Sequence, residues 1–72
     1  MLFQPDEKLM NLDQALRLLE EVAPRAAQIV ELRFFGGLTI EEVSESLEIS
    51  HLTVEREWRF AKSWLKRQLG TS

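Results

Sequence analysis

The 72-residue sequence has no cysteine and a single histidine. The missing thiols exclude a disulfide framework, a thiolate metal site and a cysteine nucleophile. No glycine-rich loop follows a predicted strand, and no set of His, Asp and Glu has the spacing of metal ligands. We therefore expect neither an enzyme nor a bound metal or cofactor, and we assign His51 to the protein surface.

Long apolar runs are also missing. No stretch approaches the roughly 20 apolar residues that a membrane span needs. The first ten residues, MLFQPDEKLM, lack the cationic start and apolar run of a signal peptide. A chain without cysteine fits a reducing compartment. The sequence thus predicts no membrane partner and a cytoplasmic location.

Tyrosine is absent and no segment alternates apolar and polar residues as a strand does, so the chain is predicted to be helical throughout. Apolar residues recur at intervals of three and four over residues 12–22, 25–35, 40–47 and 51–69. Asn11, Thr39 and Ser50 are candidate N-caps, and Gly36-Gly37 is a candidate helix stop. We expect an arm over residues 1–11 and one small domain over residues 12–70.

The last two predicted helices are separated by only three residues, Glu48 to Ser50. A short helix, a tight turn and a longer helix are typical of a helix-turn-helix. The fold prediction is an all-α, four-helix domain with a C-terminal helix-turn-helix, winged-helix-like but without a wing. On a helical wheel the last helix has a core stripe and an opposite, exposed side: the stripe holds Val54, Trp58, Ala61 and Leu65, and the exposed side holds Leu52, Arg56, Arg59 and Ser63.

The net charge of −3 conceals two segments of opposite sign. Residues 1–49 carry ten acids and four bases, whereas residues 50–72 carry five bases and two acids. A local basic patch on an acidic body favours nucleic-acid binding. The alternative is that basic residues late in a helix merely complement its dipole.

Two acidic residues stand inside this basic segment. Glu55 flanks the exposed side, where it could accept a hydrogen bond from cytosine N4 or hold Arg59 one helical turn away. Glu57 lies nearer the core side, and we expect it to meet one of the first two helices or an arginine of the body. For both, ordinary helix solubility is the simpler interpretation.

These residues carry a resemblance to a known family. The segment Arg33-Phe34-Phe35-Gly36-Gly37-Leu38-Thr39 with Glu41-Glu42, and the segment EWRFAKSWL (57–65), resemble region 4 of an extracytoplasmic-function (ECF) sigma factor of bacterial RNA polymerase. The similarity extends over about residues 12–69 and includes Pro24-Arg25.

The resemblance implies a four-helix domain whose last helix binds the −35 promoter element in double-stranded DNA. It also implies contact between the first helices and the β-subunit flap of the polymerase core, and an anti-sigma factor as a further partner. Carried over by position, it implies base contacts from Glu55, Arg56 and Arg59. The positions implied for phosphate contacts are Arg33, Thr39, His51, Leu52, Thr53 and Lys62.

The sequence departs from the family pattern at four positions. The family usually has Ala, Gly, Pro and a basic residue where this chain has Ser44, Glu48, His51 and Glu55. Glu48 is expected to cost about 1 kcal/mol if the left-handed turn is kept. A complete sigma factor also carries region 2, which binds the −10 element. Residues 1–72 hold no counterpart of it, so we expect that this chain alone cannot initiate transcription.

Two other functions remain open from the sequence. A protein-interaction module with weak or lost DNA binding could use Leu2, Phe3, Phe60 and Trp64, although Phe60 and Trp64 could equally complete the core. A LuxR-type helix-turn-helix regulator would explain the segment ISHLTVE (49–55). Two exposed arginines on the last helix favour DNA binding over a pure protein module.

Overall fold

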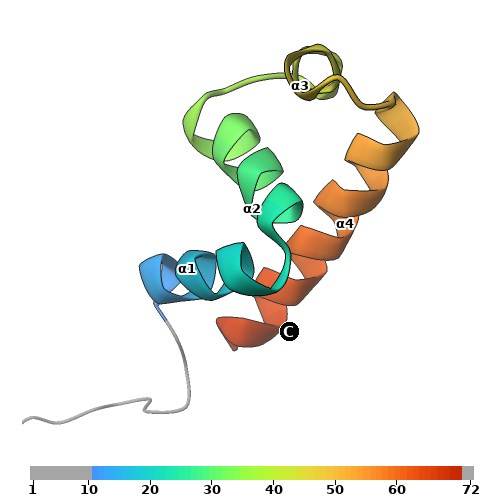
Figure 1. Ribbon diagram of the computed structural model, residues 1–72. Coiled ribbons are helices and arrows are strands. Elements are labelled where there is room, and N and C mark those ends of the chain that lie inside the picture. The colour runs from blue at the N-terminus through green and yellow to red at the C-terminus, as the bar shows by residue number, and fades with distance from the viewer. Residues whose placement is uncertain (1–10, 71–72) are drawn as a thin grey trace, which may run out of the picture.

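The computed structural model describes residues 11–70, in which the chain forms helices and connecting segments but no strand (Figure 1). The predicted arm lies outside the described residues, apart from Asn11. The all-α prediction and the positions of the four helices are confirmed. The elements are α1 (Leu12–Val22), α2 (Pro24–Val30), the π-helical segment η1 (Glu31–Phe35), α3 (Ile40–Leu47) and α4 (His51–Gln68).

Side-chain caps start three of the helices where the sequence predicted them. The Asn11 carboxamide accepts from the Gln14 amide at 2.8 Å, and the Gln14 side chain accepts from the Asn11 amide at 3.2 Å. Thr39 and Glu42 form the same reciprocal box before α3, at 3.0 and 2.9 Å. The Ser50 hydroxyl accepts an amide of the first turn of α4 at 3.1 Å. Each cap satisfies amides that a helix leaves without an internal acceptor.

The second predicted helix is not uniform. It begins one residue earlier than predicted and widens into η1, where Gly36 N–H donates to the Glu31 carbonyl at 3.0 Å. Leu38 N–H then donates to the Leu32 carbonyl, also at 3.0 Å. Gly37, at φ +70°, provides the left-handed turn expected of the glycine pair. Residues 36–39 form the connector between η1 and α3.

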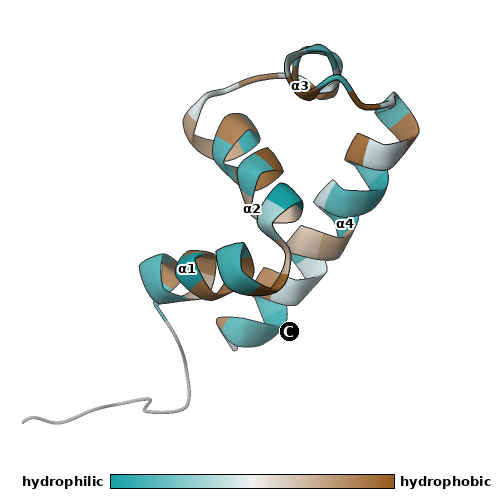
Figure 2. Cartoon of the chain, viewed as in Figure 1, coloured by the Kyte–Doolittle hydropathy of each residue, from teal (hydrophilic) through white to brown (hydrophobic). Residues whose placement is uncertain are grey.

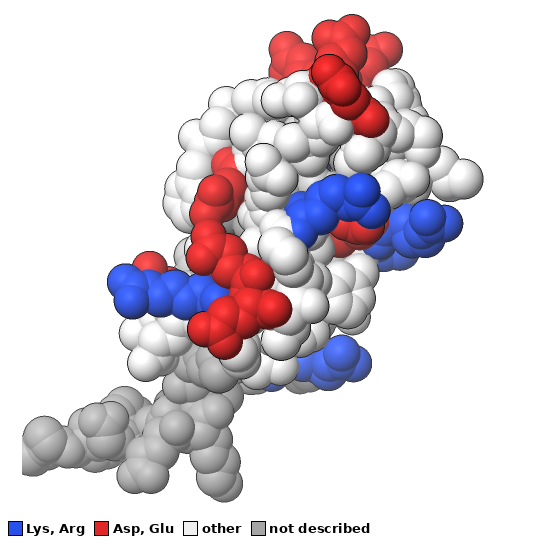
Figure 3. All heavy atoms as spheres, viewed as in Figure 1, with Lys and Arg blue, Asp and Glu red and all other residues white. Residues whose placement is uncertain are grey.

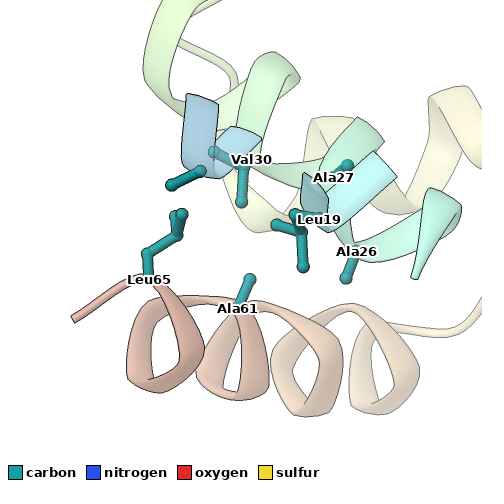
Figure 4. Close-up of a cluster of buried hydrophobic side chains, with 7 residues drawn as sticks. Leu19, Ala26, Ala27, Val30, Ala61 and Leu65 are labelled. Atoms are coloured by element: carbon teal, nitrogen blue, oxygen red, sulfur yellow. The ribbon is translucent and has the colours of Figure 1, made fainter. Parts of the chain in front are cut away.

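Two buried clusters hold the helices together. In the first, small side chains let α2 approach α4 closely, with Ala26 and Ala61 facing each other around Leu19 (Figure 4). The second joins Ile29, Val43 and Val54, all fully buried, and so fixes α3 against α2 and α4. Each helix in Figure 2 carries hydrophobic positions beside hydrophilic ones, as expected of helices with one apolar face.

Glu48 forms the turn between α3 and α4 in the left-handed conformation, at φ 59° and ψ 43°. The left-handed turn considered in the sequence analysis is therefore present, and the side chain costs about 1 kcal/mol. The Ser44 hydroxyl donates to the Ile49 carbonyl at 2.5 Å, across this turn. The hydrogen bond of Ser44 therefore spans the same turn in which Glu48 takes the left-handed conformation.

No helix between residues 11 and 70 is long and apolar enough to cross a membrane.

Candidate nucleic-acid interface

The outer face of α4 presents two guanidinium groups. Arg56 and Arg59 are both exposed, while Val54 and Ala61 on the opposite side of the helix are fully buried. Leu52, one turn before Arg56, is 66% exposed. The predicted core stripe and exposed side are therefore confirmed. Whether the exposed side contacts bases remains a prediction.

The first turn of α4 supplies further polar groups close to Arg56 in the sequence. The Thr53 amide is used by Ser50, whose hydroxyl also donates to the Thr53 hydroxyl at 2.9 Å. The amides of His51 and Leu52 donate to no acceptor in the described part of the chain. Such first-turn amides suit an anion, so the phosphate contact expected of Leu52 would come from its backbone.

Two residues expected to contact phosphate lie against the same aromatic ring. The Arg33 guanidinium carbon is 4.9 Å from the Trp58 ring centroid, and Lys62 Nζ is 5.4 Å from it. Arg33 Nη1 also donates to the Leu38 carbonyl at 2.9 Å, and its buried Nε has no hydrogen-bond partner among the described residues. A phosphate would have to compete with these internal contacts of Arg33, whereas Lys62 is exposed on α4.

The two acids of α4 differ in their surroundings. Glu55 is exposed and forms no ion pair with Arg59 in the described part of the chain, so its suggested role of holding Arg59 is not seen. Glu57 accepts three hydrogen bonds from Arg25, two from Nε at 3.2 Å and one from Nη2 at 2.8 Å. This confirms the expectation that Glu57 meets an arginine of the body. These hydrogen bonds and the carboxylate charge raise the pKa of Arg25.

The charges are only partly segregated on the surface. Figure 3 shows acidic side chains over α3 and over the side formed by α1 and α2, where basic side chains also lie, and further basic side chains along the edge formed by α4. Thr39 lies at the start of α3 with its hydroxyl and amide both engaged in the capping box. The exposed side of α4, with Arg56 and Arg59, therefore lies in the more basic part of the domain.

An apolar groove lies on a different side of α4, and the sequence did not reveal it. The groove has a volume of about 460 Å³. Phe34 lines it and is 63% exposed, while its neighbour Phe35, 67% exposed, faces another hollow. The two rings meet edge to face, with centroids 6.0 Å apart. The groove is lined by Leu12, Val30, Phe34, Trp58, Lys62, Leu65, Lys66 and Leu69.

The partner surface suggested by the sequence is only partly present. Trp64 is half-buried and packs against the first core cluster, so it completes the core. Phe60 is 45% exposed and borders a hollow at the start of α2. Leu2 and Phe3 lie outside the described residues. The two adjacent aromatic residues before the glycine pair, Phe34 and Phe35, were the signal in the sequence for exposed apolar surface here.

The arrangement of α3, the left-handed turn and α4 defines a helix-turn-helix domain with a basic, exposed second helix. The family model described as ECF sigma factor matches residues 1–71. The chain belongs to the ECF sigma factor family, whose members act in transcription initiation through DNA and RNA polymerase. It matches none of the curated proteins or solved structures compared with it.

Proposed function

We propose that residues 12–70 are the region 4 unit of an ECF sigma factor, preceded by an arm over residues 1–11, and that they bind the −35 promoter element. The observation that carries this proposal is the pair of exposed guanidinium groups of Arg56 and Arg59 on the outer face of α4. A recognition helix reaches base edges with residues of its N-terminal half. Both arginines lie in the first half of α4, which begins at His51.

In this mechanism α4 enters the major groove and its phosphate contacts set the register. The forks of Arg56 and Arg59 match the O6 and N7 acceptors of guanine, and the Glu55 carboxylate can accept from cytosine N4. Phosphate contacts are assigned to the start of α4, to the start of α3 and to two more distant cations. They are Arg33, Thr39, His51, Leu52, Thr53 and Lys62.

The test is a low-salt selection of random duplexes on the 72-residue chain, with an Arg56→Ala/Arg59→Ala variant in parallel. We expect wild type to recover a sequence motif and the variant to lose it, because each bidentate contact discriminates by about 1–3 kcal/mol. A cytosine opposite Glu55 would assign its role. If both proteins recover the same unselected pool, direct readout fails and the protein-interaction module becomes the better interpretation. Circular dichroism controls for folding of the variant.

The apolar groove supports a second part of the proposed function, which is contact with RNA polymerase. Contiguous exposed apolar surface is typical of sites that bind other proteins. Phe34 and Leu12, which is 38% exposed, both contribute apolar surface to the lining of the groove. We assign this groove to the β-subunit flap of the polymerase core, and to an anti-sigma factor when one is bound.

Phe34→Ser is expected to weaken retention of a purified β-flap fragment by about tenfold or more, the usual cost of losing an interface aromatic anchor. Phe35→Ser is the matched control, since Phe35 is its neighbour and equally exposed but does not line the groove. Affinity for the flap fragment can be measured by biolayer interferometry. If both variants lose the same affinity for the flap fragment, the contact lies elsewhere on η1. If neither variant loses affinity, the groove is not part of the interface.

A further inference from the structure

The Arg25–Glu57 bridge joins residues 32 positions apart, at the start of α2 and in the middle of α4. Nε and Nη2 of the Arg25 guanidinium both donate to the Glu57 carboxylate. This two-atom contact fixes the direction of the Glu57 side chain and also compensates its negative charge. The Arg25 side chain is 51% exposed and that of Glu57 is 25% exposed. Glu57 is therefore the more enclosed partner, and its carboxylate is held on the α2 side of α4.

This bridge is not needed to dock α2 on α4. The two helices already meet through Ala26, Ala61 and Leu19, which are buried. Ion pairs with this much solvent exposure contribute little to the stability of a fold. We therefore expect the bridge to matter mainly because it changes where negative charge lies around α4.

The position of Glu57 makes its charge matter for DNA binding. It directly follows Arg56, and Arg25, Arg56 and Glu57 border one hollow of about 450 Å³. A carboxylate free to turn towards the outer face would come within a Debye length, about 8 Å at physiological salt, of phosphates near Arg56. It would then repel the backbone that α4 must approach. The bridge both neutralises this carboxylate and directs it towards Arg25 at the start of α2.

We propose that Arg25 is a positioning residue for DNA recognition, which holds the Glu57 carboxylate on the α2 side of α4 and away from the phosphates that approach Arg56. This inference rests on the proposed binding of DNA by α4. Arg25 need not touch DNA itself. It acts through Glu57, and its effect should vanish when Glu57 carries no charge.

The test is a double-mutant cycle in the 72-residue chain with Arg25→Met, Glu57→Gln and the two combined. The probe is a labelled duplex carrying the motif recovered by wild type in the selection. We expect Arg25→Met to weaken binding about fivefold, within the usual range of coupling between contacting residues. Glu57→Gln should bind at least as tightly as wild type. Arg25→Met should then have no further effect in the Glu57→Gln background.

Other results overturn the positioning role in distinct ways. An equal loss from Arg25→Met in both backgrounds would mean that Arg25 contacts phosphate directly, and the slope of log affinity against log salt should then fall by about 0.9. Unchanged affinity in both backgrounds would show that the bridge has no role in binding. A thermal midpoint for Arg25→Met low enough to populate unfolded chains in the assay would make the loss structural. Failure of wild type to select any duplex would overturn the proposed function as well.

Discussion

Trp58→Ala is expected to remove a large part of the stability of the domain. Trp58 packs against both buried clusters, the one around Leu19 and the one around Val43. Truncating a core tryptophan usually costs about 3–5 kcal/mol. A 72-residue chain of ordinary stability has only roughly 4–11 kcal/mol in total, and small single cores are often at the low end. One substitution thus removes much or all of the available stability.

The second tryptophan provides the matched control. Trp64 is also half-buried on α4, but it packs against the first cluster alone. Trp64→Ala should therefore unfold at a clearly higher denaturant concentration than Trp58→Ala, in urea titrations followed by far-ultraviolet circular dichroism. Trp58→Phe should recover most of the stability because it restores an aromatic ring between the clusters.

The opposite order of the two alanine variants would contradict this role of Trp58. Loss of Trp58 also uncovers two cations, since Arg33 and Lys62 both lie over its ring. Cation–π contacts of partly exposed groups contribute only about 0.5–1 kcal/mol each. They add to the loss of packing but are too small to account for a destabilisation of about 3–5 kcal/mol by themselves.

Features set by local sequence were predictable. The capping box of Thr39 and Glu42 depends on residues three apart, and both bonds form in the structure. The buried stripe of α4 follows from helical periodicity. The αL turn at Glu48 was inferred from the position where the family has glycine. Each of these depends on the chain within one or two turns.

Features that depend on tertiary packing were not predictable. The sequence placed Glu57 near an arginine of the body, but only the crossing of α2 and α4 identifies Arg25 as that residue. Arg33 was expected to face phosphates because of its position in the family pattern. Whether it does remains a prediction, and only the fold shows that its guanidinium lies over Trp58 and donates to the Leu38 carbonyl. The π-helical segment η1 and the place of Phe34 in the lining of the groove were likewise not predicted from the sequence.

The two glycines of the connector look alike in sequence, yet Gly36→Ala should destabilise the domain more than Gly37→Ala. Gly36 has an ordinary helical φ of −86°, but a Cβ there would lie 2.7 Å from the Leu32 carbonyl oxygen and 3.2 Å from Leu38 Cδ1. The first contact is with backbone, which cannot rotate away. Overpacking of this kind lowers stability by about 1–3 kcal/mol. We expect a loss of about 2–3 kcal/mol for Gly36→Ala, because a shift of the Leu32 carbonyl would also distort the hydrogen bond that it accepts from Leu38 N–H.

Gly37 has the opposite problem, because its φ of +70° is unfavourable for a side chain while nothing lies within 4 Å of its Cβ position. Gly37→Ala should cost about 1 kcal/mol, the usual left-handed penalty, and Gly37→Asn should cost less since asparagine tolerates this conformation. Urea unfolding of the three variants measures the order directly. A neutral Gly36→Ala would mean that the connector can move away from Leu32. This connector leads directly to Thr39, the N-cap of α3. A mobile connector would therefore also make the orientation of α3 and α4, and so of Arg56 and Arg59, more variable relative to the rest of the domain.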